Sequence, residues 1–493
     1  MRELFANLAL HAQARCERIA LSDDRGAMDF HTLALRVAAV RDSLPESART
    51  VALVGHAGAS WIVADLAATL AACRVVPIPS FFSNEQMCHV LTDSAAQLLL
   101  SCDSALGGFY GGSHLPVHRV DAHAHVCASE HARLTYTGGA ERVIYTSGTT
   151  GTPRGVLHGD RQMGHAIQAI SAAVAANAKD VHLSALPASL LLEQIAGVFI
   201  PLMVGGRIHV SASATQAAMI GDLQPLLTLF SELAPSTTVL VPQLLAAMTT
   251  AARDGVWTPA RSLRVAAVGG APIPLTLVRE ARALGIPVIR GYGLSECASV
   301  VCVERPGDPV DDTEGACGKV LSGVRLNVID GEVVVSGPTV MNGYLNAAPL
   351  NSNVWRTGDK GRIAADGTVV ITGRCDRILV LPNGRNVASD WVEAVVLVQP
   401  RYDSARVAIA SDGLLTLDAV IRPAAKPWFS AIDNAALQRH LHELFAQLPA
   451  YARPARIRLA CAGAPTRDIE LALTLTAPSG LYDPCKLKET DLV

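Results

Sequence analysis

The chain lacks the patterns that identify a disulfide framework, a nucleic-acid-binding protein or a membrane protein. Its eleven cysteines include no C-x-x-C pair, which fits reduced thiols in a cytosol better than disulfides or a zinc site. Lys/Arg runs are scarce and the net charge is -3, so nothing indicates binding to nucleic acid or to a membrane surface. No uninterrupted apolar run reaches the roughly 18 to 20 residues of a membrane span. We therefore expect a soluble, cytoplasmic protein that holds any anionic ligand by local contacts.

The length and the start of the chain add two expectations. A chain of 493 residues, 50% of them hydrophobic, is too long for one compact core, so two or more globular units are predicted. Residues 1–11 carry charge at once and have the pattern of an amphipathic helix, not of a signal peptide.

Helical and strand patterns alternate over most of the chain, which is typical of a parallel α/β fold. Helical spacing occupies residues 33–44 and 61–73, and strands are predicted at 51–54, 75–79, 181–187, 238–241 and 263–268. Each of these strands runs into a loop of small residues. Beyond about residue 320, short strands joined at Asp330-Gly331 and Asp366-Gly367 indicate hairpins.

After about residue 375 the pattern returns to mixed α/β, and a long helix is expected near residues 434–448. The predicted fold class is therefore α/β. A large N-terminal domain of mixed and parallel sheets flanked by helices, with a β-rich subdomain, would span residues 1–373. A small, mobile α+β domain would span residues 374–493.

Residues 145–156, Tyr-Thr-Ser-Gly-Thr-Thr-Gly-Thr-Pro-Arg-Gly-Val, are the most informative segment. They contain five Ser/Thr hydroxyls, three glycines and the cation Arg154. Glycines allow backbone N–H groups to approach an anion closely, and hydroxyls and a guanidinium add donors. No Gly-Lys-Ser/Thr follows Gly148 at the spacing of a Walker A loop. The segment predicts a phosphate-binding loop of another kind, with a Gly/Thr-rich surface turn as the alternative.

Four further segments make the surface-turn alternative weaker. They are Gly269-Gly-Ala-Pro272, Gly291-Tyr-Gly-Leu-Ser-Glu296, Trp355-Arg-Thr-Gly-Asp359 and Gly373-Arg-Cys-Asp376. Taken singly, Tyr292 could be a core aromatic, Glu296 a solvated loop carboxylate and Asp359 a turn cap. Together the segments indicate a nucleoside triphosphate site with a carboxylate for a metal ion.

In their order and spacing these motifs resemble the AMP-forming adenylate-forming superfamily, which includes acyl-CoA synthetases, adenylation domains and luciferases. The resemblance covers nearly the whole chain. It implies that Thr146, Ser147, Gly148, Thr149, Thr150 and Gly151 form the loop over the β- and γ-phosphates of ATP. Arg154 stands where the family usually has Lys, which keeps the charge but changes the donor geometry.

The same resemblance implies the roles of the other motif residues. Gly270, Ala271 and Pro272 would line the adenine site with Tyr292 stacked beside it, and Asp359, helped by Arg374, would accept the ribose hydroxyls. Gly293 and Ser295, which replaces the usual Thr next to Glu296, would also belong to the nucleotide site. Glu296, with Thr146, would bind Mg²⁺, and the loop around Gly384 would enter the site for thioester formation. The implied reaction is attack of a carboxylate on the α-phosphorus of ATP with loss of pyrophosphate, followed by transfer of the acyl group to the thiol of coenzyme A.

The acid is predicted to be apolar. Leu190, Leu191 and Leu192 precede Glu193 where the family often has His or an aromatic residue, and no Asp is found to pair with an amino group. The block from Arg377 to Val387 resembles the long-chain acyl-CoA synthetase version, so the chain is interpreted as nearest to fatty acyl-CoA synthetases. An acyl- or peptidyl-carrier protein is the alternative acceptor.

The C-terminus departs from the family pattern. The catalytic Lys normally follows a Gly directly, but here Leu481 follows Gly480, and Lys486 is the predicted replacement, with Lys488 behind it. If neither serves, the chain would be a catalytically weakened acyl- or nucleotide-binding homologue.

Two other clusters are interpreted as unrelated to catalysis. The histidines 114, 118, 123 and 125 have no fixed Cys or carboxylate partner in the sequence, which disfavours a metal site. Cys297 and Cys302 are expected to pack in the core.

Overall fold

The computed structural model describes residues 1–14, 17–102, 115–124, 133–146, 153–381, 386–410 and 412–471. By its internal contacts the chain divides into two compact units. The first comprises Met1–Ile378 and Leu397–Pro400, and the second comprises Leu379–Val396 and the residues from Arg401 onward. The boundary predicted between residues 373 and 374 lies a few residues before this division.

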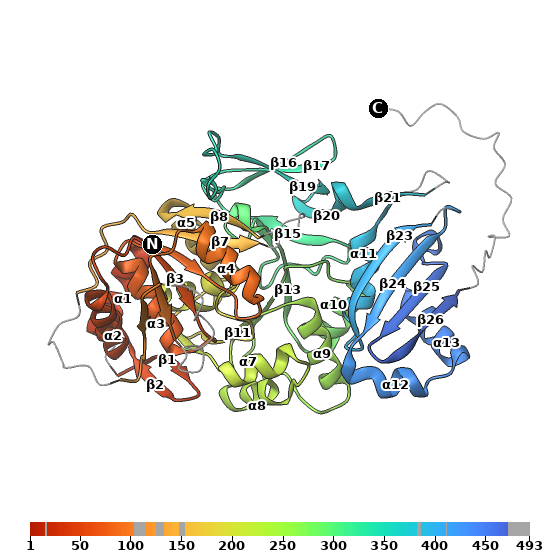
Figure 1. Ribbon diagram of the computed structural model, residues 1–493, viewed down its shortest axis with the longest axis horizontal. Helices are drawn as coiled ribbons and strands as arrows, with labels where there is room; N and C mark the ends of the chain where they lie inside the picture. Colours follow the sequence, from red (N-terminus) through yellow and green to blue (C-terminus); the bar gives the residue numbers. More distant parts are fainter. Residues whose placement is uncertain are drawn as a thin grey trace. The chain divides into compact units, whose positions relative to one another are not determined.

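A seven-stranded sheet carries the two strands of the first unit that flank the predicted phosphate loop (Figure 1). Its strand order is β18-β8-β7-β4-β3-β5-β6. The strands are β3 (Thr50–Val54), β4 (Arg74–Pro77), β5 (Leu98–Ser101), β6 (Val117–Arg119), β7 (Glu141–Thr146), β8 (Arg154–Gly159) and β18 (Gly343–Tyr344). The pairs β7–β4, β4–β3, β3–β5 and β5–β6 are parallel, whereas β18–β8 and β8–β7 are antiparallel.

A thirteen-stranded sheet carries the other motifs, in the order β16-β17-β19-β20-β15-β14-β13-β12-β11-β9-β10-β1-β2. Its parallel part consists of β1 (Ile19–Asp23), β9 (Val181–Leu183), β10 (Arg207–His209), β11 (Thr237–Leu240), β12 (Val265–Val268) and β13 (Val288–Tyr292). Antiparallel strands extend both edges: β2 (Gly26–Asp29), β14 (Cys302–Val303), β15 (Ala316–Val320), β16 (Arg325–Ile329), β17 (Glu332–Ser336), β19 (Val354–Ile363) and β20 (Thr368–Arg374).

Helices connect and cover these sheets. They are α1 (Arg2–Ala14), α2 (Phe30–Ser43), α3 (Ala59–Leu70), α4 (Asn84–Asp93), α5 (Asp160–Ala173), α6 (Ile200–Val204), α7 (Ala212–Met219), α8 (Gln224–Leu233), α9 (Pro242–Arg253) and α10 (Leu275–Ala283). A π-helical segment, η2 (Glu193–Phe199), and the 3₁₀ turns η3 (Ser295–Cys297) and η4 (Cys375–Arg377) complete the unit. Local signals start several helices: Asp29 accepts a hydrogen bond from the N–H of Thr32 (2.6 Å), and Ser83 and Gln86 form a capping box.

The core of the first unit lies between its two sheets. Every residue of α3 is buried, and this helix contacts β3 and β4 of one sheet and β1 of the other. A helix that is apolar all round is expected at such a place. Its one charged residue, Asp65, pairs with the buried Arg142 at 2.8 Å, which keeps the carboxylate from being left unpaired.

The second unit has its own sheet and core. Strands β23 (Tyr402–Ile409), β24 (Leu415–Ile421), β25 (Arg456–Cys461) and β26 (Ala464–Glu470) form a four-stranded sheet, and β21 (Ile378–Val380) pairs with β22 (Asn386–Ala388). The helical segments are α11 (Ser389–Leu397), η5 (Pro423–Ala425), α12 (Lys426–Ala431), α13 (Asn434–Phe445) and η6 (Ala450–Ala452). The apolar faces of α11 and α13 contribute to one buried cluster with the sheet.

The predicted α/β class is confirmed. One predicted strand is shorter than expected: β9 ends at Leu183, and the chain then leaves the sheet at Leu186–Ser189 on its way into η2. Pro187 within this stretch has no N–H for a ladder bond, which is consistent with the early end of the strand. Among the described residues, no helix has both the length and the apolar character that a membrane span needs.

Candidate nucleotide and acyl site

Two predicted motifs follow neighbouring parallel strands. Gly269 and Gly270 come directly after β12, and Tyr292 and Gly293 lie at the end of β13 and just beyond it. The carboxyl ends of parallel strands meet at one edge of a sheet, where α/β proteins bind their ligands. The four residues line the same cavity, together with Thr146 and Ser295.

Close backbone packing explains one motif glycine. A Cβ atom on Gly293 would lie 1.6 Å from the carbonyl oxygen of Ser299, so no larger residue fits without moving the backbone. Gly270 has a φ of 84°, a conformation that glycine adopts at least cost. The tight turn after β13 therefore depends on Gly293.

Tyr292, Asp359 and Arg374 form a hydrogen-bonded cluster. The Tyr292 hydroxyl donates to Asp359 Oδ2 at 2.6 Å, and Arg374 Nη1 donates to Asp359 Oδ1 at 3.1 Å. Asp359 and Arg374 are cross-strand partners on β19 and β20, which holds them opposite each other. The structure thus brings together three residues that were predicted from separate motifs.

Burial changes the acidity of this cluster. Burial raises the pKa of the Asp359 carboxyl, although its hydrogen bond from Tyr292 and the positive charge of Arg374 oppose this shift. Burial and the neighbouring Asp359 carboxylate raise the pKa of Tyr292, so that its hydroxyl stays a donor at neutral pH.

The hairpin β7–β8 places two more predicted residues opposite each other. Thr146 ends β7, Arg154 begins β8, and the two are paired across the hairpin. The predicted phosphate-loop residues Ser147, Gly148, Thr149, Thr150 and Gly151 connect these strands and lie outside the described residues.

Glu296 and Arg154 are linked by a residue that the sequence analysis missed. The Tyr344 hydroxyl donates to Glu296 Oε1 at 2.8 Å, and the Arg154 guanidinium lies over the Tyr344 ring at 3.7 Å from its centroid. Tyr344 follows Gly343 in the short strand β18. This Gly-Tyr dipeptide was the only local feature of the sequence that could have pointed to Tyr344.

His158 fixes the turn that carries Glu296. Its side chain is fully buried on β8, and Nε2 lies 2.7 Å from the carbonyl oxygen of Ser295, to which it donates. Burial lowers the pKa of His158 to about 4 from its ordinary 6.5, so the ring is neutral at physiological pH.

This lowered pKa predicts an acid-sensitive fold. Because the unfolded chain takes up a proton on His158 at higher pH than the folded chain does, stability is lost as the pH falls from about 6.5 toward 4. Between pH 7 and pH 5 the loss is about 2 kcal/mol from this residue. We expect His158→Gln to lose that part of the pH dependence in urea unfolding of the full-length protein. An unchanged difference between the two pH values would contradict the assignment.

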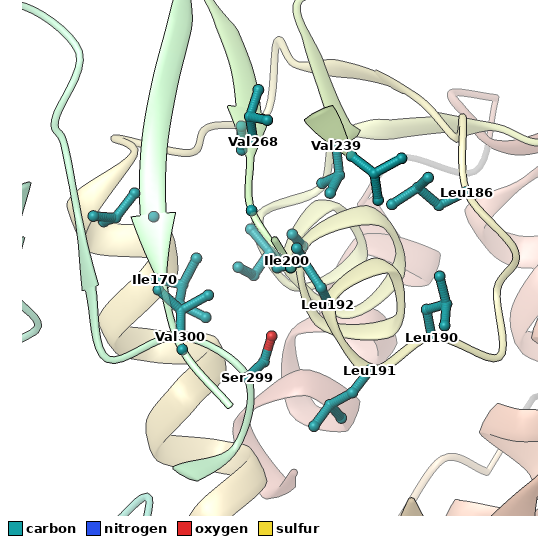
Figure 2. A pocket seen from close by; sticks show the side chains of 18 of the residues that line it. Ile170, Leu186, Leu190, Leu191, Leu192, Ile200, Val239, Val268, Ser299 and Val300 are labelled. Carbon is teal, nitrogen blue, oxygen red and sulfur yellow. The ribbon is translucent and has the colours of Figure 1, made fainter. Parts of the chain in front are cut away.

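The cavity has a volume of about 500 Å³ and continues from the motif loops into an apolar channel. Figure 2 shows its walls, which come from α5, from residues 186–192, from η2 and α6 and from strands of the large sheet. The apolar lining residues include Ile170, Val174, Leu186, Leu190, Leu191, Leu192, Ala196, Ile200, Val204, Val239, Val241, Val265, Ala267, Val268, Leu294, Val300 and Val303. The three leucines singled out in the sequence therefore line this channel.

Polar side chains at the far end of the channel are already paired. Asp180 forms an ion pair with Arg264 at 2.5 Å and accepts from Ser236 at 2.8 Å. His182 lies 3.2 Å from Glu193 Oε1 and 3.1 Å from the Thr237 hydroxyl. Within the described part of the chain, the channel lining includes no lysine or arginine.

Two of the predicted adenine-site residues do not line this cavity, and two other predicted residues are not described by the structure. Ala271 and Pro272 are exposed and do not line it, and Gly384 and Lys486 lie outside the described residues. Cys297 and Cys302 are buried, and burial raises the pKa of both thiols, as expected for packing residues.

The predicted histidine cluster divides between described and undescribed residues. His118 lies 3.2 Å from the Ser43 hydroxyl, and His123 pairs with Asp23 at 3.0 Å. His114 and His125 lie outside the described residues.

The chain is thus an α/β protein in which the motif loops lie at the carboxyl ends of parallel strands, beside an apolar channel. The model of the AMP-binding enzyme family matches residues 8–345. The chain belongs to this family, and thus to the AMP-forming adenylate-forming superfamily.

Individual comparisons agree with the family match. The chain is 28% identical over 444 residues to a 2-succinylbenzoate–CoA ligase of Bacillus velezensis, covering 82% of this chain and 85% of the relative. It is 26% identical over 379 residues to the enzyme of that name from Bacillus licheniformis, covering 73% and 76%.

Solved structures show the same fold. An anthranilate CoA ligase in complex with anthranoyl-AMP superposes with a TM-score of 0.77 at 18% identity, covering 93% of both chains. An O-succinylbenzoate coenzyme A synthetase of Bacillus subtilis in complex with AMP superposes with a TM-score of 0.73 at 23% identity, covering 92% of this chain and 94% of the other. The protein is an AMP-forming acid–thiol ligase, for which ATP, Mg²⁺ and coenzyme A are the standard substrates and cofactor.

Proposed function

We propose that this ligase activates an elongated, apolar monocarboxylic acid, a medium- or long-chain fatty acid foremost, and transfers the acyl group to coenzyme A. The observation that carries this proposal is the apolar channel that opens at the motif loops. A cytoplasmic location, predicted from the cysteine pattern, is part of the proposal.

The reaction has two balanced steps. An oxygen of the acid attacks the α-phosphorus of ATP, the bond to the β-phosphate oxygen breaks, and pyrophosphate leaves. The thiol of coenzyme A then loses its proton and attacks the acyl carbon, and AMP leaves with the electrons of the C–O bond. Positioning and charge stabilisation supply most of the catalysis in such phosphoryl chemistry.

The motif residues supply these effects in our proposal. Tyr292 and Gly270 contact the adenine, and Asp359, oriented by Arg374, accepts the ribose hydroxyls. Arg154 and the loop after Thr146 bind the departing phosphates. The support is that Thr146, Gly270 and Tyr292 line one cavity, that Tyr292 hydrogen-bonds to Asp359, and that Arg374 hydrogen-bonds to Asp359 in turn, whereas Arg154 contacts Tyr344.

The residues present also fit Mg²⁺. Mg²⁺ in nucleotide enzymes is bound by one or two carboxylates together with substrate phosphates. Glu296, whose Oε1 is held by the Tyr344 hydroxyl, and the hydroxyl of Thr146 would hold it. When bound, the ion neutralises charge that develops on the phosphates.

The dimensions of the channel favour an elongated acid. Its lining extends from Gly270, which lies just beyond β12 at the motif end, along β12 to Val265 at the far end. At about 3.3 Å per residue, this stretch measures roughly 16 Å. Three backbone bonds span about 3.8 Å, so an extended chain of about a dozen bonds fits that length.

The chemistry of the lining disfavours a second charge on the acid. The name 2-succinylbenzoate, carried by the relatives, denotes two carboxyl groups. A second carboxylate in this channel would meet no lysine or arginine among the described lining residues, and burying an unpaired charge is costly. Asp180, already paired with Arg264, offers little to an amino group.

Two alternatives stay open within the proposal. The names of the relatives point to aromatic acids, and a compact aromatic monocarboxylate would fill the motif end of the same channel. The acceptor could be a carrier protein, which is tested by comparing thioester formation with coenzyme A and with a holo-carrier protein. Failure with coenzyme A alone would refute our choice of acceptor.

A panel of matched acids tests the substrate class. We expect pyrophosphate release, with hydroxylamine trapping, to be highest with octanoate to dodecanoate. Benzoate and indoleacetate are expected to be weaker, and 2-succinylbenzoate and phenylalanine weaker still, by at least tenfold. A preference for 2-succinylbenzoate would contradict the argument from the channel lining.

Ala267 offers an internal control of the same prediction. It faces the channel on β12, three residues and about 10 Å from Gly270. Ala267→Phe should lower kcat/KM for dodecanoate by about tenfold or more and leave short acids nearly unaffected, because it closes the far part only. Ala267→Val should give a smaller effect, and equal losses for all acids would contradict the depth assigned to the channel.

A further inference from the structure

Tyr344 contacts two residues of opposite charge. Its hydroxyl donates to Glu296 Oε1 at 2.8 Å, and its ring faces the Arg154 guanidinium at 3.7 Å. Among the described residues, this hydrogen bond is the only one recorded for the Glu296 side chain, and no ion pair is recorded for Arg154. The phenol thus connects a cation and a carboxylate that do not pair with each other.

The sheet explains why the three groups meet. Tyr344 on β18 is paired with Val156 on β8, and Arg154 lies two residues before Val156 on the same face of β8. Diagonal neighbours of this kind are within reach of aromatic and long side chains. The N–H of Met341, just before β18, also donates to the carbonyl oxygen of Glu296 at 2.8 Å, which ties the strand to the η3 turn.

The ring and the hydroxyl of Tyr344 are both held in place. The ring packs edge-on against Trp355, with centroids 6.0 Å apart. The hydroxyl is held by its hydrogen bond to Glu296 Oε1. Arg154 is exposed to solvent, and its contact with the Tyr344 ring restricts the position of its guanidinium.

We propose that Tyr344 is a positioning residue for adenylation: its ring holds the Arg154 guanidinium for contact with the ATP phosphates, and its hydroxyl orients the Glu296 carboxylate for Mg²⁺. This inference rests on the roles proposed above for Arg154 and Glu296.

The same contact gives a reason for arginine at position 154. A guanidinium is planar and stacks on an aromatic face, whereas an ammonium group is a compact, strongly hydrated charge. Arg154→Lys is therefore not a conservative change as long as Tyr344 is present.

The test uses binding of ATP to the full-length protein without any acid, so that it is independent of the substrate class. Calorimetric titrations with ATP at a series of Mg²⁺ concentrations give the half-saturating Mg²⁺ concentration and the ATP affinity. Pyrophosphate release with the best acid of the panel gives kcat and KM separately. The variants are Tyr344→Phe, Tyr344→Leu, Arg154→Lys and the double variant Arg154→Lys/Tyr344→Leu. Tyr136→Phe is the matched control, since it also removes a phenol that donates to a carboxylate, that of Asp160 (2.5 Å).

The effects of the Tyr344 hydroxyl and of the Tyr344 ring on ATP and Mg²⁺ binding should be separable. Tyr344→Phe keeps the ring, and we expect a rise of about tenfold in half-saturating Mg²⁺, as for other groups that orient a metal ligand. ATP affinity at saturating Mg²⁺ should change less than threefold. Tyr344→Leu should add a loss of about tenfold in ATP affinity at saturating Mg²⁺. Arg154→Lys should weaken ATP binding by a similar factor alone and by almost nothing in the Tyr344→Leu background.

An unchanged Mg²⁺ dependence in Tyr344→Phe, as in Tyr136→Phe, would overturn the role of the hydroxyl. If Arg154→Lys lowers ATP affinity equally in the wild-type and Tyr344→Leu backgrounds, the role of the ring is overturned. If Tyr344→Leu does not fold, Tyr344→Phe still decides the role of the hydroxyl. Failure of the underlying site would look different: the wild-type protein would then bind no ATP with Mg²⁺, or Glu296→Gln would leave its Mg²⁺ dependence unchanged.

Discussion

Replacing Asp359 by asparagine is expected to reduce the affinity for AMP and kcat/KM for ATP by about 10² to 10³. The Asp359 side chain is 11% exposed and is held between the Tyr292 hydroxyl and Arg374. Hydrogen bonds to a charged acceptor contribute about 1.5 to 3 kcal/mol each, and two ribose hydroxyls would lose that acceptor. The amide also removes the charge that holds Arg374 in place.

The neighbouring Asp376 provides the control for this prediction. It accepts from Arg374 Nε at 3.2 Å, but it is 53% exposed on its side chain, where an ion pair contributes little. Asp376→Asn should therefore change AMP affinity by less than threefold. Calorimetric AMP titrations, with melting temperatures to check folding, decide the matter. If Asp359→Asn binds AMP as tightly as the wild-type protein does, Asp359 is a turn residue and not the ribose acceptor.

The sequence predicted several strands of the parallel part of the fold because each is a short apolar run closed by glycine or proline. Val265–Val268 runs into Gly269-Gly270, and Thr237–Leu240 is closed by Pro242, so the pattern of a buried strand and its following loop is local. The strand predicted at residues 181–187 was too long, because apolar residues after Leu183 line the channel instead of continuing the sheet. An apolar run alone does not distinguish these two uses.

The π-helical segment that forms the channel wall could not be predicted from the pattern. Its Gly197 is needed because a Cβ atom there would lie 2.2 Å from Glu193 Oε1 and 2.7 Å from His182 Nε2. Glu193 and His182 are buried against each other. The reason for glycine at position 197 is this contact, which is visible only in the three-dimensional structure. Irregular helical turns of this kind are frequent at functional sites.

Tyr344 and His158 were missed for a related reason. The function of Tyr344 depends on the pairing of β18 with β8, which joins segments far apart in the sequence. His158 acts on the carbonyl group of Ser295, and a backbone acceptor leaves no trace in the sequence. Motif residues such as Tyr292 and Asp359 could be found because their family pattern is local. Their hydrogen bond to each other could not be predicted from the sequence.

The last prediction concerns the lysine that the motif pattern leaves uncertain. Lys486 lies outside the described residues, and its role is inferred from the order Gly480-Leu481 and the lysine that follows. A cation at the reacting carboxylate stabilises charge in the adenylation step, and removing one such donor typically costs about 10² to 10³ in rate. We expect Lys486→Ala to lower pyrophosphate release by that factor, with AMP affinity within threefold of the wild type. Thioester formation from a supplied acyl-AMP should be nearly unchanged, because that step begins after pyrophosphate has left. Lys488→Ala is the control and should remain close to wild type in both steps. If Lys488→Ala shows the large loss instead, the two roles are exchanged, and if neither variant does, adenylation in this enzyme proceeds without a lysine from this segment.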